Sequence, residues 1–463
     1  MKKTVMLFVL VSCFFASHIT LAESPNFIVI LSDDQSWVGS SVEMIPGREN
    51  TKSDYFETPN LERFAAAGMQ FSRGYSPAPY CCPTRRAFCI GQTPARHVYQ
   101  KDQPGWARRY REQLSIPRML KMANSNYVTA HFGKWDSRFD GVSPEEMGYD
   151  LSDGKTGNET GGAKGTGGPA AVVDPKLIYS MTDRATEFMK QQVEADKPFY
   201  LQLSHYAVHL DIFYSDETYA AAQSREIGKK HSLPEFAAMT SDLDAGIGKL
   251  MKAVDALNLR DDTYVFYFSD NGGRLTMPGQ KESTKDPRNA PLFGGKGSMY
   301  EGGIRVPFFA IGPGIEPGSH CDVPVTGLDL FPTMADLAGL EQRLPESLDG
   351  GSLKELLLNQ GHGAVERAKP YLIFHQAVAR KAQSAIIQGD YKLVKTWAAD
   401  ETELFDLSKS LTEKSDLSET KPKIATKMHK QLVEFLDEVG AETRKTTDKE
   451  RQRKLFETLD GSN

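Results

Sequence analysis

The sequence predicts an α/β protein built on a large mixed, mainly parallel sheet with helices on both faces. A smaller C-terminal subdomain with an antiparallel sheet and one helix is expected to follow. Two observations support this prediction. Short apolar, β-branched runs alternate with helical periodicity through most of the chain, as in parallel sheets covered on both sides. Near the end, short strands follow one another closely before a single amphipathic helix.

The composition is that of an ordinary globular protein. The chain has 463 residues, of which 40% are hydrophobic and 25% are charged. This length is sufficient for a large core and two subdomains. The formal net charge is −6, so the overall charge gives no support to a nucleic-acid partner. A polyanionic substrate would have to be bound by a local basic pocket.

The first residues predict an export signal. Two lysines precede the apolar run 5–15, and residues 20–22 (Thr-Leu-Ala) offer small residues for cleavage. The run is too short to span a membrane, and no later stretch reaches about 20 apolar residues. We therefore expect 1–22 to be a signal peptide and the mature protein to be periplasmic or secreted. Lipoprotein anchoring through Cys13 is the alternative.

Two predicted strands each end in a pair of oxygen-bearing side chains. The strands are expected at 27–31 and 264–268, and ligands of α/β sheets bind beyond the carboxyl ends of strands. As isolated motifs these side chains could equally be capping or turn residues. Together they offer four oxygen ligands, which suit Ca²⁺, or less well Mg²⁺, better than Zn²⁺. The four residues are Asp33, Asp34, Asp270 and Asn271.

Helices and further strands are expected between and after these two strands. Pro59 begins a helix that ends at Gly68, and Pro234 begins a long amphipathic helix that reaches Leu257. Three more strands are expected, at 127–132, 199–203 and 306–311.

Two lysines and one histidine also follow predicted strands or lie in loops. Lys134 follows the strand 127–132, His209 follows the strand 199–203, and Lys296 lies in a glycine-flanked loop. Each alone is more often a solvated side chain. Together with Arg85 they would suffice to hold a tetrahedral oxyanion.

The cysteines are too few for a disulfide scaffold. Without Cys13, the chain keeps Cys81, Cys82, Cys89 and Cys321. The plain interpretation of the adjacent pair is two small buried residues, or one disulfide such as Cys82 to Cys321.

Together, these motifs resemble the type I, formylglycine-dependent sulfatases of the alkaline-phosphatase-like superfamily. Cys-Cys-Pro-Thr-Arg at 81–85 matches the C-x-P-x-R signature, Gly-Lys-Trp at 133–135 matches a second motif, and 300–307 (YEGGIRVP) matches a third. The resemblance covers nearly the whole mature chain. Its register places Cys81 at the nucleophile position and leaves Cys82 in the free position.

The resemblance implies that a maturation enzyme oxidises Cys81 to formylglycine during export. One hydroxyl of the hydrated aldehyde would attack sulfur, and the other would later expel sulfate. Asp33, Asp34, Asp270 and Asn271, with the modified Cys81, match the metal ligands, and the metal is usually calcium. Arg85 matches the residue that holds the diol, and Lys134 and Lys296 match the sulfate-binding lysines. Lys296 and His209 are placed to protonate the departing alcohol.

One position departs from the family pattern. The family usually reads Gly-Lys-Trp-His, whereas this chain has Asp136 after the tryptophan. The missing histidine normally takes the proton that frees sulfate. Asp136 could be that base, since carboxylates do this work, and His131 or His205 could substitute. Without such a base, the protein would bind a sulfated glycan but would not hydrolyse its sulfate ester.

A basic, aromatic segment after the nucleophile is expected to bind the substrate. It contains Arg96, His97 and Trp106, and Trp106 could stack on a sugar ring. A solvated charged loop is the alternative. Together with the predicted export of the protein, this segment favours a sulfated oligo- or polysaccharide as substrate. Two other functions remain open: a phosphoester or phosphonate hydrolase of the same superfamily, and an inactive sulfated-glycan-binding homologue.

The expected organisation is a catalytic domain at 23–360 and a C-terminal subdomain at 361–463. The subdomain should contain strands, an amphipathic helix at 424–439 and a charged tail after Glu442. A Gly-, Thr- and Ala-rich stretch, 153–171, is either a linker or a pocket rim. The strands are expected at 371–374, 385–387 and 391–395.

Overall fold

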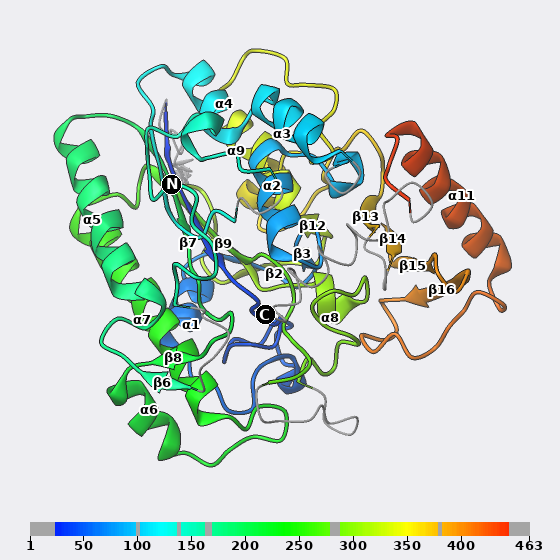
Figure 1. Ribbon diagram of the computed structural model, residues 1–463, viewed down its shortest axis with the longest axis horizontal. Coiled ribbons are helices and arrows are strands. Elements are labelled where there is room, and N and C mark those ends of the chain that lie inside the picture. The colour runs from blue at the N-terminus through cyan, green and yellow to red at the C-terminus, as the bar shows by residue number, and fades with distance from the viewer. Residues whose placement is uncertain are drawn as a thin grey trace, which may run out of the picture.

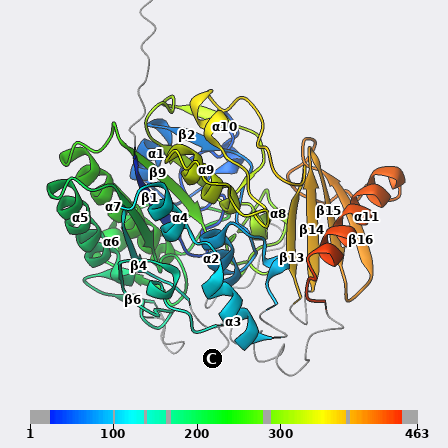
Figure 2. The same ribbon diagram turned by 90° about the horizontal axis from the view of Figure 1, so that it is seen from above.

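The computed structural model describes residues 24–98, 102–136, 140–162, 169–277, 288–377 and 382–443. At its centre lies an eight-stranded sheet in the order β11-β2-β10-β9-β1-β7-β4-β5, with helices against both faces (Figure 1 and Figure 2). Its strands are β1 (Asn26–Ser32), β2 (Met69–Phe71), β4 (Val128–Gly133), β5 (Leu151–Ser152), β7 (Phe199–Ser204), β9 (Thr263–Ser269), β10 (Phe308–Ile311) and β11 (Ser319–Cys321).

The middle of this sheet is parallel. Strand β1 pairs in parallel with β7 on one side and β9 on the other, and β4 continues the parallel run beyond β7. Strand β10 is antiparallel to both β9 and β2. The predicted mixed, mainly parallel sheet is therefore confirmed.

Strand β1 shows why the run 27–31 has no polar alternation. Phe27, Val29 and Leu31 pack into the core on one face of the sheet, and Ile28 and Ile30 pack into the core on the other. Each of these side chains is completely buried, which stabilises the fold by about 1.5–3 kcal/mol per side chain.

The helices divide between the two faces. The core on the Ile28 side includes residues of α1 (Pro59–Ala66), α5 (Ile178–Glu194) and α7 (Pro234–Ala256). The core on the Phe27 side includes residues of α2 (Cys81–Ile90), α3 (Gln103–Glu112), α4 (Ile116–Ala123), α9 (Leu330–Leu337) and α10 (Lys354–Leu358). The helices expected at 59–68 and 234–257 thus form within a few residues of their predicted ends.

A second, four-stranded antiparallel sheet lies beside the first domain, at the right of Figure 1. Residues from one face of this sheet pack with the helix α11, and residues from the other face pack with Tyr75, Met299 and Ile304 of the catalytic part. The predicted antiparallel subdomain with one helix is thus confirmed. Its elements are β13 (Leu372–Gln376), β14 (Gln383–Gln388), β15 (Tyr391–Thr396), β16 (Glu401–Asp406) and α11 (Pro422–Glu438).

The smaller elements complete the fold. Two two-stranded sheets pair β12 with β3 and β6 with β8. These strands and the remaining helices are β3 (Gly74–Tyr75), β6 (Ala170–Ala171), β8 (Phe213–Tyr214), β12 (Val325–Thr326), α6 (Asp216–Gln223) and α8 (Glu301–Ile304).

Three predictions about the ends and cysteines have different outcomes. The expected signal peptide, Cys13 and most of the charged tail lie outside the described residues. Within the described ranges, no helix has the length and apolar character needed to cross a membrane. The disulfide considered between Cys82 and Cys321 is wrong, because both are buried thiols outside any disulfide, as are Cys81 and Cys89.

Candidate active site

The two oxygen-bearing pairs meet at one edge of the sheet. Because β1 and β9 are parallel neighbours, with Ser32 opposite Ser269, the residues after them lie side by side. The backbone N–H of Asp34 donates to Oδ1 of Asp270 at 3.1 Å, and Nδ2 of Asn271 donates to Oδ1 of Asp34 at 2.8 Å. The structure thus brings the predicted pairs, Asp33 and Asp34 with Asp270 and Asn271, into one buried cluster.

Helix α2 delivers Cys81 to this cluster. The helix begins at Cys81 after the extended residue Tyr80, so the cysteine lies at the positive end of the helix. Its Sγ is 3.4 Å from Oδ1 of Asp33 and 3.8 Å from Oδ1 of Asp34. Burial and the negative charge of Asp270 raise the pKa of this thiol well above its usual range. An unmodified Cys81 would therefore remain a protonated thiol, which is a poor nucleophile.

Arg85, one turn further along α2, ties the helix to the acidic edge. Its Nε and Nη2 donate to Oδ2 of Asp270 at 3.0 and 2.7 Å, and its Nη1 donates to the backbone oxygen of Lys134 at 2.6 Å. The guanidinium also lies 3.6 Å from Asp33. These bonds, two of them to one carboxylate oxygen, fix the position of Arg85 relative to Asp270 and Lys134.

Two lysines neutralise the adjacent carboxylates. Nζ of Lys134 lies 2.5 Å from Oδ2 of Asp33, and Nζ of Lys296 lies 2.7 Å from Oδ1 of Asp34 and 3.4 Å from Sγ of Cys81. Burial alone would raise the pKa of each aspartate, but the neighbouring lysine cations outweigh burial and the pKa of both falls below its usual value. Asp33 and Asp34 are therefore ionised.

The cluster fits a hard divalent cation. One possible ligand atom from each of Asp33, Asp34, Cys81 and His209 lies within 4.8 Å of the others. Oδ1 of Asn271 is buried and has no hydrogen-bond partner among the described residues. An orphaned carbonyl oxygen beside two ionised carboxylates is a ligand set for Ca²⁺ or Mg²⁺.

His209 faces the same cluster. Its Nδ1 lies 2.5 Å from the backbone oxygen of Leu210, and its Nε2 lies 3.8 Å from Oδ2 of Asp34. Burial and the charge of Lys296 lower the pKa of His209 to about 3, so the ring is neutral. Asn158, in the Gly-rich stretch after Lys134, places Nδ2 3.5 Å from Nε2 of His209, which agrees with the pocket-rim alternative for this stretch.

Asp136 is fully buried close to Lys134 and α2. Its φ is 64°, its backbone N–H donates to Thr156 O at 2.8 Å, and its backbone oxygen accepts from Sγ of Cys82 at 3.3 Å. The charge of Asp136 is among the interactions that raise the pKa of Lys134, although burial opposes them and Asp33 contributes more. Asp136 therefore lies within electrostatic reach of the site.

The two alternative histidines belong to the core. Burial lowers the pKa of His131 and of His205 to about 3, and both rings are completely buried. His131 packs edge-on against Trp135 and Tyr149 at 5.0 and 5.6 Å.

The prediction that Arg96, His97 and Trp106 bind the substrate needs a correction. Trp106 is 2% exposed and stacks on His97 at 4.3 Å and on Tyr110 at 5.5 Å, so it cannot present a ring to a sugar. The apolar residues of α3 recur at helical spacing and face the core. Arg96 is held by Asp349 at 2.9 Å and lies over the ring of Phe435. The three predicted residues are therefore structural.

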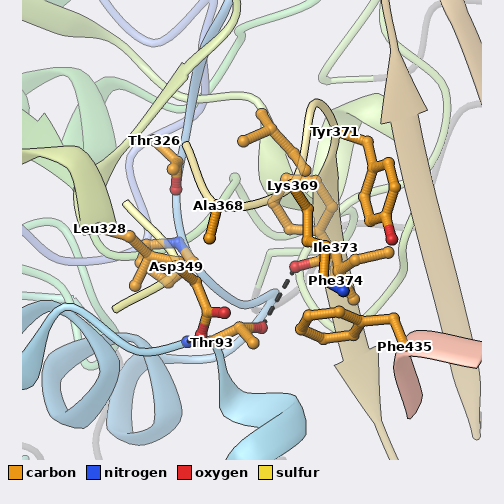
Figure 3. Close-up of a pocket in the computed structure, with 12 residues that line it drawn as sticks. Thr93, Thr326, Leu328, Asp349, Ala368, Lys369, Tyr371, Ile373, Phe374 and Phe435 are labelled. Atoms are coloured by element: carbon orange, nitrogen blue, oxygen red, sulfur yellow. Dashed lines mark hydrogen bonds between the residues drawn. The ribbon is translucent and has the colours of Figure 1, made fainter. Parts of the chain in front are cut away.

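Asp349 also lines a pocket at the junction with the C-terminal sheet (Figure 3). Oγ1 of Thr93 donates to the backbone oxygen of Ile373 at 3.2 Å. Figure 3 draws this bond as a dashed line beside Phe435. None of the acidic or cationic site residues lines this pocket. It marks where the two sheets are joined and lies outside the reaction centre.

The C-terminal sheet also contacts the loop that carries Lys296. Sequence reasoning missed this contact between the two subdomains. Gln376 on β13 donates to the backbone oxygen of Gly297 at 2.9 Å, and Gln383 on β14 accepts from the N–H of Met299 at 3.3 Å. The N–H of Lys296 donates to Gly273 O at 3.0 Å. The site lysine is thus positioned by both subdomains.

Comparisons with known proteins show which family this chain resembles. The sulfatase family model matches residues 25–340, and the model of the N-sulphoglucosamine sulphohydrolase C-terminal region matches 292–438. Human N-acetylgalactosamine-6-sulfatase is 28% identical over 370 residues, covering 73% of this chain and 66% of that protein. A sulfatase of Formosa agariphila is 25% identical and covers 96% of this chain and 94% of its own length.

A solved structure shows the same fold. The crystal structure of Ps i-CgsB in complex with k-i-k-neocarrahexaose matches with a TM-score of 0.72 and 25% identity, covering 89% of this chain and 93% of that one. This chain spans about two thirds of the length of the N-acetylgalactosamine-6-sulfatase, 66%. Since the family model covers more than half of the 463 residues, the chain belongs to the sulfatase family.

Proposed function

We propose that this protein hydrolyses a sulfate ester of a sulfated oligo- or polysaccharide, after Cys81 has been converted to formylglycine. The observation that carries the proposal is the position of Cys81. It opens a helix, lies 3.4 Å from Asp33 and 3.4 Å from Nζ of Lys296, and is 1% exposed. As a thiol its raised pKa leaves it unreactive, which is consistent with a precursor that must be modified before it acts.

Formylglycine at this position would supply a hydrated aldehyde, with one hydroxyl to attack sulfur and a second to release sulfate. Because Cys81 is buried in the folded chain, a maturation enzyme would have to act before folding is complete. This agrees with modification during export. The predicted signal peptide would provide that route.

The residues around Cys81 are suited to hold a sulfate group. Arg85 and Lys134 place cationic groups on one side of the cluster, and Lys296 places its ammonium beside Sγ of Cys81. Preorganised cations in a buried site stabilise charge that develops on the sulfate oxygens in the transition state. Lys296 is placed to give a proton to the departing alcohol oxygen, and the facing His209 would do so only in its protonated form, which a bound sulfate beside the ring would favour.

Asp33, Asp34, Asp270 and Asn271 would hold Ca²⁺, with the modified Cys81 as a further ligand. The ion would add a fixed positive charge beside the sulfate oxygens. Burial and Asp33 raise the pKa of Asp270 to about 6, which reflects three carboxylates crowded at one edge. A divalent cation would relieve that repulsion.

Asp136 is proposed as the base that takes the proton when sulfate leaves. It is buried near Lys134, and carboxylates serve as general bases when their environment is tuned. The contribution expected of such a base is about 10²–10⁴-fold.

The carbohydrate substrate is proposed from the relatives. One is named for N-acetylgalactosamine 6-sulfate, and the solved structure holds a neocarrahexaose. A periplasmic or secreted protein would meet such polymers outside the cytoplasm.

Measured sulfate release tests the proposal. The matured protein with Ca²⁺ is incubated with sulfated glycan oligosaccharides, an aryl sulfate, and matched phosphate and phosphonate esters. The proposal expects sulfate release from at least one sulfated carbohydrate and far slower release of phosphate. Preference for phosphate or phosphonate esters would support the alternative hydrolase. Binding without release in fully converted protein would support a non-turning-over glycan binder.

A further inference from the structure

Three consecutive backbone oxygens after β4 accept hydrogen bonds from side chains of α2, the helix that begins at Cys81. These oxygens belong to the buried segment 134–136, which lies outside regular secondary structure. Buried carbonyl groups need hydrogen-bond partners, and here one helix supplies all three. The bonds run from Nη1 of Arg85 to Lys134 O at 2.6 Å, from Nη1 of Arg86 to Trp135 O at 3.3 Å and from Sγ of Cys82 to Asp136 O at 3.3 Å. The helix that carries Cys81 therefore also holds the segment that follows β4.

Arg86 makes several further contacts. Its Nε and Nη2 donate to Oδ2 and Oδ1 of Asp140 at 2.6 and 2.9 Å, and both side chains are buried, with exposures of 1% and 0%. The guanidinium also lies 5.1 Å from the ring centroid of Trp135 and 5.2 Å from that of Tyr110. Burial opposes the charged form, but Asp140 outweighs burial and raises the pKa of Arg86 well above its usual range. A planar, charged fork between two rings suits arginine and not lysine.

Through these contacts Arg86 holds the chain on both sides of Asp136. Trp135 directly precedes Asp136, and Asp140 follows it by four residues. Oδ1 of Asp140 accepts from the N–H of Val142 at 2.9 Å, and Nε1 of Trp135 donates to Val142 O at 2.7 Å. One buried cation thus joins both flanks of the proposed base to α2.

Asp136 depends on such support more than Lys134 does. The φ of Asp136, 64°, lies in the left-handed region, which residues other than glycine populate sparsely. A base takes a proton only from a group within hydrogen-bond distance, so a shift of about 1 Å in its position is costly. Lys134 has supports of its own, because its N–H donates to Ser204 O at 2.8 Å and its Nζ contacts Asp33. Loss of Arg86 should therefore act mainly on Asp136.

Stability alone is a weak explanation for the Arg86–Asp140 pair. Replacing a buried ion pair by apolar side chains of similar volume is often neutral or stabilising, because the apolar pair avoids the desolvation of two charges. A buried pair is better suited to fixing one arrangement of the chain than to raising the free energy of unfolding. Here it fixes Trp135 and Asp140, on either side of Asp136, against the helix that carries Cys81.

We propose that Arg86 is a positioning residue for the release of sulfate, because it fixes Asp136 relative to Cys81. The inference rests on the proposed function and deepens it by naming a residue that acts through Asp136. In the step concerned, Asp136 accepts the proton of the remaining hydroxyl. The oxygen of that hydroxyl becomes the aldehyde oxygen as the bond between carbon and the sulfate oxygen breaks, and sulfate leaves as a dianion. The bond from Cys82 to Asp136 O is a second contact of the same kind.

The test removes the ion pair without leaving a buried charge unpaired. A double variant, Arg86→Met with Asp140→Leu, replaces both charges by apolar side chains and should melt close to wild type. With matured protein and a chromogenic sulfate ester, its steady-state kcat should fall about ten- to hundredfold. A burst of alcohol equal to the enzyme concentration should precede the slow phase, because attack on sulfur does not need Asp136. An unchanged kcat, or a fall without a burst, in folded protein would overturn the inference.

A double-mutant cycle shows whether Arg86 acts through Asp136. In the Asp136→Asn background, the double variant should change kcat by less than about threefold, because the group that Arg86 positions is already absent. An equal fall in both backgrounds would contradict the inference. Arg86→Lys keeps the charge but loses the fork, and its kcat should lie between those of wild type and the double variant. Arg343→Met with Glu346→Leu, at an ion pair whose side chains are 84% and 81% exposed, should behave as wild type.

Hydrogen exchange separates this inference from the proposed function, and it is measured in Cys81→Ser protein, where no turnover is expected. The amides of Trp135 and Asp136 donate to Thr156 at 2.9 and 2.8 Å, and their exchange reports how firmly this segment is held. The double variant should speed their exchange at least about tenfold and leave the amides of β9 unchanged. If wild type releases no sulfate but this exchange accelerates, the proposed reaction fails and the positioning of Asp136 by Arg86 stands. If sulfate is released while neither exchange nor kcat changes, the reaction stands and the inference fails.

Discussion

Nζ of Lys392, on β15 of the C-terminal sheet, lies 2.8 Å from the carboxylate of Glu301, which follows the Lys296 loop, and both side chains are completely buried. Glu301 also accepts from Oη of Tyr75 at 3.0 Å and from Arg305 at 3.2 Å. Lys392 reaches Glu413 at 2.8 Å as well. Buried ion pairs therefore join the smaller sheet to the catalytic part, close to the proposed sulfate-binding Lys296.

Replacing Lys392 by methionine should destabilise the protein strongly. The change leaves two buried carboxylates without their shared cation, and breaking a buried pair in this way costs about 3–5 kcal/mol of unfolding free energy. Denaturant unfolding of Lys392→Met measures the loss. Lys190→Met, at a lysine that is 54% exposed, is the matched control and should change stability by less than about 1 kcal/mol. Equal effects of the two variants would contradict this account of the junction.

Glu413 should make the stability of this junction depend on pH. Burial, together with the negative charge of Glu301, outweighs Lys392 and raises the pKa of Glu413 to about 7, above the usual 4.5. Between these two pH values the unfolded chain loses this proton while the folded chain keeps it. The stabilising contribution is therefore present at low pH and is lost as pH rises through 7.

Comparison of wild type with Glu413→Gln isolates that contribution. From pH 4.5 to pH 8, the unfolding free energy of wild type should fall relative to the variant by an amount on the order of 2–3 kcal/mol. A difference that stays constant over this range would show that Glu413 does not titrate in the folded protein.

Asp136→Asn should separate attack from sulfate release. If Asp136 takes the proton that frees sulfate, the first turnover proceeds and steady-state kcat falls about 10²–10⁴-fold. Stopped-flow measurement with a chromogenic sulfate ester would then show a burst of alcohol equal to the enzyme concentration, followed by a slow phase. Asp183→Asn, at a surface carboxylate that is 62% exposed, should keep the wild-type rate. An unaltered kcat in Asp136→Asn would remove Asp136 from the mechanism.

Calcium should stabilise the folded protein through the acidic edge. A ligand that binds only the folded state at a hundredfold excess over its Kd adds about 2.7 kcal/mol. Calorimetric melting with and without Ca²⁺ measures this gain, and a chelator should reverse it. Asn271→Ala removes the orphaned oxygen and should reduce the gain, whereas Asn126→Ala, at an exposed asparagine, should preserve it. An equal gain in both variants would place the ion elsewhere.

The sequence was sufficient to predict the parts of the site that follow local rules. Buried strands such as β1 have an apolar run with no alternation, and the residues directly after them must lie at the edge where parallel strands end. Cys81, Arg85 and Lys134 could be placed because they occur in short motifs at segment boundaries. Cys81 and Arg85 lie one helical turn apart, whereas Lys134 is 49 residues from Arg85 and was placed by the resemblance of its Gly-Lys-Trp motif.

Trp106 shows where that reasoning fails. Its basic neighbours on α3 suggested an exposed substrate-binding segment. However, Trp106 and Tyr110 are four residues apart and lie on the buried face of a helix. That spacing was visible in the sequence and could have indicated a core position. Charge alone does not distinguish the solvent face of an amphipathic helix from a binding loop.

The Lys392–Glu301 pair could not be predicted for a different reason. Its role depends on which charged side chains lie close together in three dimensions, and Lys392 and Glu301 are 91 residues apart. A lysine in a buried ion pair has the same local sequence signature as a solvated one.

The mass of the Cys81-containing peptide tests the central claim most directly. The chain is produced with a formylglycine-generating enzyme, digested and analysed by mass spectrometry, with Cys81→Ser and Cys82→Ser prepared in parallel. The account predicts that Cys81 exchanges its sulfur and two hydrogens for one oxygen, that Cys82→Ser is still converted, and that Cys81→Ser is not. Conversion should rise together with sulfate release. Unmodified thiols at Cys81 and Cys82 in protein that releases sulfate, or in material from the native host, would contradict it.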